Sequence, residues 1–207
     1  MDIFEKCCTY TAANDVRESG LYPYFIPLTN NEGPEARIGD HHLIMIGSNN
    51  YLGLTMHPKV RQAALDAVKT YGTSCTGSRF LNGTLEMHLE LERRLAEWVG
   101  KERALVFSTG YQVNVGVISA LVARDDFAIT DKDDHASIID GCRLSYGTMK
   151  RFPHSDVDAL DRVLASLPET SGKLVIVDGV FSMGGDIAPL PDLVRVCRKH
   201  EARLMVD

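Results

Sequence analysis

The 207-residue chain has no long hydrophobic run. Its longest apolar stretch, residues 113–123, is shorter than the roughly 20 residues that a membrane-spanning helix needs. No charged segment followed by an apolar one opens the chain, so a secretory signal is not indicated. We therefore expect no transmembrane segment and a cytoplasmic location.

Patterns for disulfides and metals are also missing. The five cysteines are odd in number and include no Cys-x-x-Cys pair, so we expect reduced thiols and neither a disulfide framework nor a zinc site. The histidines His41, His42, His57 and His154 lie in loops and show no ligand spacing, and an adjacent pair such as His41 and His42 is typical of a surface. We predict no metal site.

The chain lacks a basic stripe and a nucleotide-binding motif. Its net charge is −6, with acidic and basic residues interspersed, and nucleic-acid binding is therefore not expected. No internal repeat occurs, which excludes solenoid architectures. Neither GxGxxG nor GxxxxGK[ST] is present, so dinucleotide and nucleoside-triphosphate sites are weakly supported.

What the sequence does have is a regular alternation of apolar strands and amphipathic helices. The expected strands cover 103–107, 126–130, 149–152, 173–178 and 203–206, and the expected helices cover 111–123, 137–145, 156–167 and 190–200. This alternation predicts an α/β fold with a mainly parallel sheet covered by helices on both faces. Ligands of such sheets bind outside the carboxyl ends of the strands, so the polar residues that follow each strand are the candidate site.

The first part of the chain shows a different pattern. We expect a helical segment over 1–20, a strand over 43–46, and helices that begin at Pro58 and His88. A stretch with three prolines separates the first two of these elements. We assign residues 1–55 to an N-terminal arm and small-domain segment, and residues 56–207 to the first part of a larger domain.

The first candidate group is Ser108, Thr109, Gly110 and Tyr111, where an expected strand meets a helix. Free amides and the helix dipole at such an N-terminus favour a phosphate, and Gly110 lets the backbone approach it closely. Ser108 or Thr109 can add a hydroxyl donor. An ordinary helix cap explains the same residues equally well.

The second candidate is His135, which follows the next expected strand. A histidine there can stack on an aromatic cofactor or transfer protons near neutral pH, and Asp133 or Asp134 can orient it. The alternative is that Asp134 only caps the helix that begins at Ala136.

Asp178, Ser182 and Asp207 are the remaining candidates at strand ends. Asp178 can lie beside a ring and Ser182 can donate to a ligand oxygen, although a flexible glycine-rich turn is the plainer explanation. The carboxylate of Asp207 can hold a heterocyclic nitrogen protonated, because a buried anion favours the charged form of its partner. A simple loop aspartate is again the alternative. The order of these candidates along one sheet is stronger evidence than any one of them.

That order resembles the fold-type I pyridoxal-phosphate enzymes, and the motifs resemble the α-oxoamine synthases. The matching runs are 47–54, 76–84 with His88, 91 and 92, 108–114, 134–137, and 178–183 with 185 and 186. The runs 48–51 and 78–84 are most similar to bacterial serine palmitoyltransferases, with 8-amino-7-oxononanoate synthase and glycine C-acetyltransferase as relatives. The resemblance covers nearly the whole chain and implies a fold-type I transferase fold preceded by an N-terminal arm.

The resemblance implies pyridoxal 5′-phosphate as the cofactor. Backbone amides of Gly110 and Tyr111 would then hold its phosphate beside Ser108 and Thr109, and His135 would stack on its ring and bind the substrate carboxylate. Asp178 and Ser182 would contact the cofactor. Asp207 would pair with the ring nitrogen, which makes the ring an electron sink.

The resemblance also implies substrates and a subunit partner. An amino acid, for which we expect L-serine, would condense with a long-chain acyl-CoA and lose carbon dioxide, giving an aminoketone and CoA. This is the first step of sphingolipid synthesis in a serine palmitoyltransferase. Asn50, Tyr51 and Arg79 would lie near the substrate, and a homodimer would form the active site at its interface.

In the family that the chain resembles, a second histidine and the Schiff-base lysine follow the aspartate motif that matches Asp207, and neither is among these 207 residues. We therefore expect these 207 residues to be the front part of a longer enzyme and to be inactive alone. The lysines Lys101, Lys132, Lys150 and Lys173 stand in no motif that could replace it. A different pyridoxal-phosphate enzyme, such as an aminotransferase or a carbon–carbon lyase, and a non-catalytic partner subunit are the alternatives.

Overall fold

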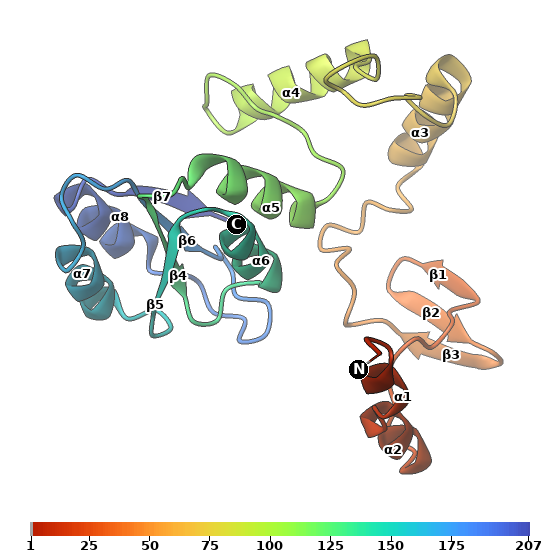
Figure 1. Ribbon diagram of the computed structural model, residues 1–207. Coiled ribbons are helices and arrows are strands. Elements are labelled where there is room, and N and C mark those ends of the chain that lie inside the picture. The colour runs from red at the N-terminus through yellow and green to blue at the C-terminus, as the bar shows by residue number, and fades with distance from the viewer. Residues whose placement is uncertain (1) are drawn as a thin grey trace. The chain divides into compact units, whose positions relative to one another are not determined.

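The computed structural model describes residues 2–207, except for the side chains of residues 31 and 32. The chain forms two compact units, one ending at Leu85 and one from Glu86 to Asp207 (Figure 1). This division lies later in the chain than the expected boundary after residue 55. The functional division into an arm and a cofactor-binding part stays a prediction.

The first unit is built from short elements. These are α1 (Glu5–Cys8), α2 (Ala12–Glu18), β1 (Asn30–Glu32), β2 (Glu35–Ile38), β3 (His41–Ile44) and α3 (Pro58–Tyr71). The three strands form an antiparallel sheet in the order β1-β2-β3. The expected strand over 43–46 thus begins two residues earlier. Its two partners were not predicted, because β1 and β2 are short and mostly polar.

Large apolar side chains of the first unit are mostly exposed. Phe25, Ile46 and Phe80 each have 94% of their surface exposed, whereas Ala36 is the buried hydrophobic residue in the described part of this unit. The unit therefore buries little apolar surface within itself. Exposed apolar side chains in this number are typical of a surface that another protein segment covers.

The second unit contains a four-stranded parallel sheet in the order β5-β4-β6-β7. Its strands are β4 (Phe127–Asp131), β5 (Thr148–Phe152), β6 (Lys173–Val177) and β7 (Arg203–Val206). Its helices are α4 (Glu86–Trp98), α5 (Gly110–Leu121), α6 (Ala136–Leu144), α7 (Val157–Ala165) and α8 (Leu190–Lys199). The predicted α/β architecture is confirmed. No helix among residues 2–207 has both the length and the apolar character that crossing a bilayer requires.

Both faces of the sheet are buried, as the apolar strands predicted. In β6, Val175 and Val177 belong to the core cluster under α7 and α8, and Ile176 belongs to the cluster under α5 and α6. Successive side chains of a strand point to opposite faces. Figure 1 shows α7 and α8 on one face of this sheet and α5 and α6 on the other.

The prediction of a strand over 103–107 is wrong. These residues are not paired with any strand in the described part of the chain. The backbone N–H of Val106 instead donates to the Glu92 carboxylate of α4 at 3.0 Å. An apolar segment becomes a strand only where a neighbour completes its hydrogen bonds, and here a side chain satisfies one of them.

Helices α5 and α6 pack closely at Gly141. A Cβ built on this residue would lie 2.8 Å from the backbone oxygen of Asn114 and 3.1 Å from Cβ of Ile118. The missing side chain therefore lets the two helices approach. This approach brings Asn114 of α5 within hydrogen-bonding distance of Ser137 of α6.

Candidate active site

The carboxyl ends of β4, β6 and β7 lie side by side, because these strands are parallel neighbours in the sheet. Asp131 ends β4, Asp178 follows β6, and Asp207 follows β7. Helix α6 begins at the same edge, directly after His135. The structure thus gathers three of the predicted site residues, His135, Asp178 and Asp207, at one edge of the sheet.

His135 is the N-cap of α6, and its side chain accepts a hydrogen bond from the backbone N–H of Ser137 at 3.2 Å. The Nδ1 atom also lies 2.6 Å from the Ser137 hydroxyl oxygen. Ser137 therefore orients the exposed imidazole, and not Asp133 or Asp134. The expectation that Asp134 caps this helix is wrong, since His135 does so itself.

Asp134 instead joins the ends of two strands. Its carboxylate accepts from the backbone N–H of Asp131 at 2.9 Å and from that of Asp178 at 3.0 Å. Burial raises the pKa of Asp134 to about 8 and outweighs these two donors, while the nearby carboxylates of Asp131 and Asp178 raise it further. Burial also raises the pKa of Asp178, against the hydrogen bond that it accepts from the His135 backbone.

Asn114 is a site residue that the sequence interpretation missed. Its buried amide donates to the Asp207 carboxylate at 2.7 Å and to the Ser137 hydroxyl at 2.9 Å. Together with the Ser137–His135 contact, these bonds form a continuous chain from His135 to Asp207. One signal was available in the sequence, because Asn114 is a polar residue between the apolar Val113 and Val115 of a helix that is otherwise largely apolar.

The N-terminus of α5 has the features of an ordinary helix cap and also those of a phosphate site. Thr109 is the N-cap, and its hydroxyl accepts from the backbone N–H of Gln112 at 3.1 Å. A Cβ on Gly110 would meet no atom within 4 Å, so there is open space beside this backbone. Tyr111 donates from its hydroxyl to Asp140 at 3.0 Å, and this bond raises the pKa of Tyr111. Ser108 is exposed.

Ser182 lies in the loop between β6 and α8 and is exposed. The loop is closed by a bridge between Val180 and Ile187 and turns at Gly185, which has a φ of +76°. Contact of Ser182 with a cofactor stays a prediction.

His154 connects this loop to the sheet. Its Nδ1 lies 2.9 Å from a carboxylate oxygen of Asp131, and its Nε2 lies 2.7 Å from one of Asp186. The imidazole also meets the Phe181 ring edge-on, with 4.5 Å between the ring centroids. The bond to buried Asp131 and that to Asp186 raise the pKa of His154.

We expect the loop around Ser182 to loosen as the pH rises. A raised pKa means that the bridge between His154 and its two carboxylates is fully formed below the ordinary histidine pKa of about 6.5 and weakens as the pH rises through the folded value. Limited proteolysis of the loop should therefore speed up with pH in the wild type, and His154→Gln should show a high rate at every pH. A pH-independent rate in the wild type would contradict the bridge. His57→Gln, at an exposed N-cap, is the control.

Asn50, Tyr51 and Arg79 belong to the first unit, where their described contacts are local. The side chain of Asn50 donates to the Thr55 hydroxyl at 2.9 Å, and Tyr51 is 83% exposed. The backbone oxygen of Arg79 accepts from the Thr84 hydroxyl at 2.6 Å. Their role near the substrate stays a prediction.

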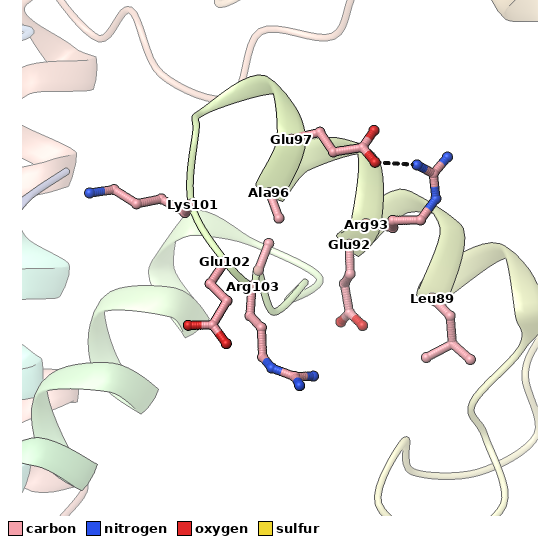
Figure 2. Close-up of a pocket in the computed structure, with 9 residues that line it drawn as sticks. Leu89, Glu92, Arg93, Ala96, Glu97, Lys101, Glu102 and Arg103 are labelled. Atoms are coloured by element: carbon pink, nitrogen blue, oxygen red, sulfur yellow. Dashed lines mark hydrogen bonds and ion pairs between the residues drawn. The ribbon is translucent and has the colours of Figure 1, made fainter.

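A further hollow in the second unit is lined by none of the predicted site residues. It has a volume of about 360 Å³ and lies between α4 and the segment that follows it (Figure 2). Figure 2 shows charged side chains of both signs around it, with Arg93 paired to Glu97. Glu92 from its lining accepts the Val106 hydrogen bond described above. Glu92 thus holds α4 and the segment that follows it together, and we assign this hollow no ligand.

Known proteins show clear similarity to this chain. Residues 41–207 match the family described as aminotransferase class I and II. The serine palmitoyltransferase of Sphingobacterium spiritivorum is 47% identical over 203 residues, which cover 98% of this chain and 51% of that protein. The 8-amino-7-oxononanoate synthase of Geobacter sulfurreducens is 46% identical over 93% of this chain and 49% of its own length.

A solved structure has the same fold. The serine palmitoyltransferase from S. paucimobilis with bound PLP–myriocin aldimine is 40% identical, with a TM-score of 0.94 over 100% of this chain and 53% of that one. The chain thus spans about half the length of the curated relatives that it matches. These findings confirm the predicted resemblance to α-oxoamine synthases and the predicted fold-type I architecture.

Proposed function

Because the chain belongs to the aminotransferase class I and II family, we propose that the carboxyl edge of its sheet binds the cofactor of an amino-acid acyltransferase. The predicted cofactor, pyridoxal 5′-phosphate, is confirmed by the family match and by a solved relative that carries it. The observation that carries the proposal is the hydrogen-bonded chain from His135 to Asp207 at that edge.

The residues at this edge fit the cofactor. The open space beside Gly110 and the first amides of α5, which have no partner inside the helix, suit a phosphate. The carboxylate of Asp207 suits a protonated ring nitrogen, because a nearby negative charge favours the charged form of its partner.

Each predicted residue has a defined task in this proposal. Gly110 and Tyr111 hold the phosphate through their amides, with Ser108 and Thr109 beside them. His135 lies against the ring and binds the carboxylate of the amino acid. Asp207 keeps the ring nitrogen protonated, and Asp178 and Ser182 complete the cofactor contacts. When bound, the cofactor supplies the electron sink that lets an amino acid lose its α-proton.

We propose L-serine and a long-chain acyl-CoA as the substrates, giving an aminoketone, CoA and carbon dioxide. The support is the group of relatives named serine palmitoyltransferase and the TM-score of 0.94 to one of them. The place of this reaction is then the first step of sphingolipid synthesis, in the cytoplasm. The relatives named 8-amino-7-oxononanoate synthase, at 46% identity, support a second candidate with a different amino acid and acyl group.

The proposed assembly is a homodimer with the active site at its interface. The exposed apolar side chains of the first unit, such as Phe25 and Phe80, support it, because a second copy would bury them. In this assembly Asn50, Tyr51 and Arg79 lie near the substrate.

Release of free CoA tests the proposed function. The whole natural protein that carries this sequence, loaded with pyridoxal phosphate, should release CoA from palmitoyl-CoA only when L-serine is present. A panel of amino acids and acyl-chain lengths separates the two candidates. Transfer to a keto acid without CoA release would instead identify an aminotransferase.

The 207-residue chain alone should show no CoA release. Lys132 follows Asp131 at the end of β4 and is exposed, and none of Lys101, Lys132, Lys150 and Lys173 stands in a cofactor motif, so we propose that none of these four lysines holds the cofactor covalently. Reduction of the chain with borohydride in the presence of pyridoxal phosphate, followed by peptide mapping, should reveal no specifically labelled lysine. A single labelled lysine would contradict this proposal.

A further inference from the structure

We infer that Asn114 is a positioning residue that fixes Asp207 and His135 in one arrangement through its single amide group. The inference rests on the proposed function, because it assigns the two fixed residues to the pyridoxal-phosphate ring. Asn114 touches neither the ring nor the substrate in this account. It acts through the two residues that do.

The orientation of the Asn114 amide follows from its neighbours. Nδ2 lies 2.7 Å from an oxygen of the Asp207 carboxylate. A carboxylate only accepts hydrogen bonds, so the opposite orientation would place the amide oxygen against it. The amide must therefore present its NH₂ group to Asp207. Its second hydrogen points to the Ser137 hydroxyl oxygen, 2.9 Å away.

The same bonds fix the tautomer of His135. The Ser137 oxygen accepts from Asn114, so its own hydrogen is free to donate to Nδ1 of His135 at 2.6 Å. The backbone N–H of Ser137 donates to the same Nδ1 at 3.2 Å. Two donors on one ring nitrogen require it to be unprotonated, and neutral imidazole then carries its hydrogen on Nε2. His135 thus has an N–H donor for a substrate carboxylate.

The burial of this arrangement makes it strong. Asn114 is 2% exposed and Ser137 is fully buried at 0%. Water cannot replace their hydrogen bonds there, and a bond to a charged group in such a place is stronger than one between neutral groups. The buried amide of Asn114 holds one oxygen of the Asp207 carboxylate.

A double-mutant cycle on pyridoxal-phosphate binding tests the inference. The dissociation constant is measured by fluorescence titration for the whole natural protein and for its N114A, D207N and N114A/D207N variants. Loss of a part-buried hydrogen bond to a charged group predicts that N114A binds about 10-fold more weakly. In the D207N background the same change should alter the constant by less than about 2-fold, because residues that act through each other are not additive.

The protonation of the cofactor adds a second readout. Nitrogen-15 NMR of pyridoxal phosphate labelled at its ring nitrogen should show a protonated nitrogen in the wild type and a less protonated one in N114A. Ser119→Ala is the matched control, since its hydroxyl lies on the same helix and, among the described residues, donates to the Val115 backbone. This control should bind like the wild type.

The outcomes separate the inference from the proposed function. If the wild type does not bind pyridoxal phosphate, both fail. If the wild type binds, and N114A either loses the same affinity in both backgrounds or loses no affinity, the inference alone fails.

Should N114A not fold without cofactor, N114D replaces it. Its new carboxyl repels Asp207 when ionised and donates when protonated, so its affinity should recover as the pH falls, and an unchanged affinity would overturn the inference.

Discussion

Asp134→Ala is expected to destabilise the second unit by about 2 to 6 kcal/mol. Its carboxylate accepts hydrogen bonds from the backbone N–H groups of Asp131 and Asp178. Both residues are buried, with 1% and 7% of their surface exposed. Leaving a buried donor unsatisfied costs about 1–3 kcal/mol, and here two are lost at once. Urea unfolding gives the total loss. Hydrogen exchange should show the largest loss of protection at the amides of Asp131 and Asp178.

Asp134→Asn is the matched variant, because it keeps one acceptor and removes the charge. The pKa of Asp134 is about 8 in the folded chain, against about 3.9 in a peptide. The folded state therefore holds a proton that the unfolded state releases, so stability falls as the pH rises between these values. D134N lacks this dependence. Its free energy of unfolding should therefore rise relative to that of the wild type between pH 5 and pH 8. A loss in D134A below about 1 kcal/mol, or parallel pH profiles, would contradict the assigned role.

Gly141→Val is expected to cost about 3 kcal/mol or more, since overpacking a close helix contact forces the backbone to shift. The new Cβ would lie 2.8 Å from the Asn114 backbone oxygen, which is part of α5 and cannot rotate away. The shift should also separate Asn114 from Ser137. We therefore expect G141V to lose both thermal stability and affinity for pyridoxal phosphate.

Gly116→Ala in the facing helix α5 is the control for this change. A Cβ there would lie 3.1 Å from the far end of the Phe107 ring, which is a side chain that can move. Alanine is also the better helix former by about 1 kcal/mol, which offsets the crowding. The melting temperature of G116A should stay close to that of the wild type. Equal losses in G141V and G116A would show that the α5–α6 contact is not the cause.

The sequence predicted the second unit well where strands are buried on both faces. The four strands from β4 to β7 and the four helices from α5 to α8 follow from local apolar patterns, and the structure has them within a few residues. The strand over 103–107 failed because strand formation depends on a partner that a local pattern does not reveal. The antiparallel pair β1 and β2 was missed because its residues lack the apolar alternation on which the prediction depends.

Some residues of the candidate site could be predicted from local sequence patterns and others could not. His135, Asp178 and Asp207 could be predicted because each follows a strand end. The polar Asn114 stands out in an apolar helix, but its role and that of His154 could not be assigned, because they come from contacts with residues 93 and 32 positions away. Only the close packing of α5 on α6 and the order of the strands bring these partners together.

A crystal structure of the whole natural protein with pyridoxal phosphate tests the central claim most directly. We predict a ring at the carboxyl edge of β4, β6 and β7, with its face against His135, its nitrogen within hydrogen-bonding distance of Asp207, and its phosphate at the N-terminus of α5. A cofactor bound at another place, or a ring nitrogen that does not contact Asp207, would contradict the account.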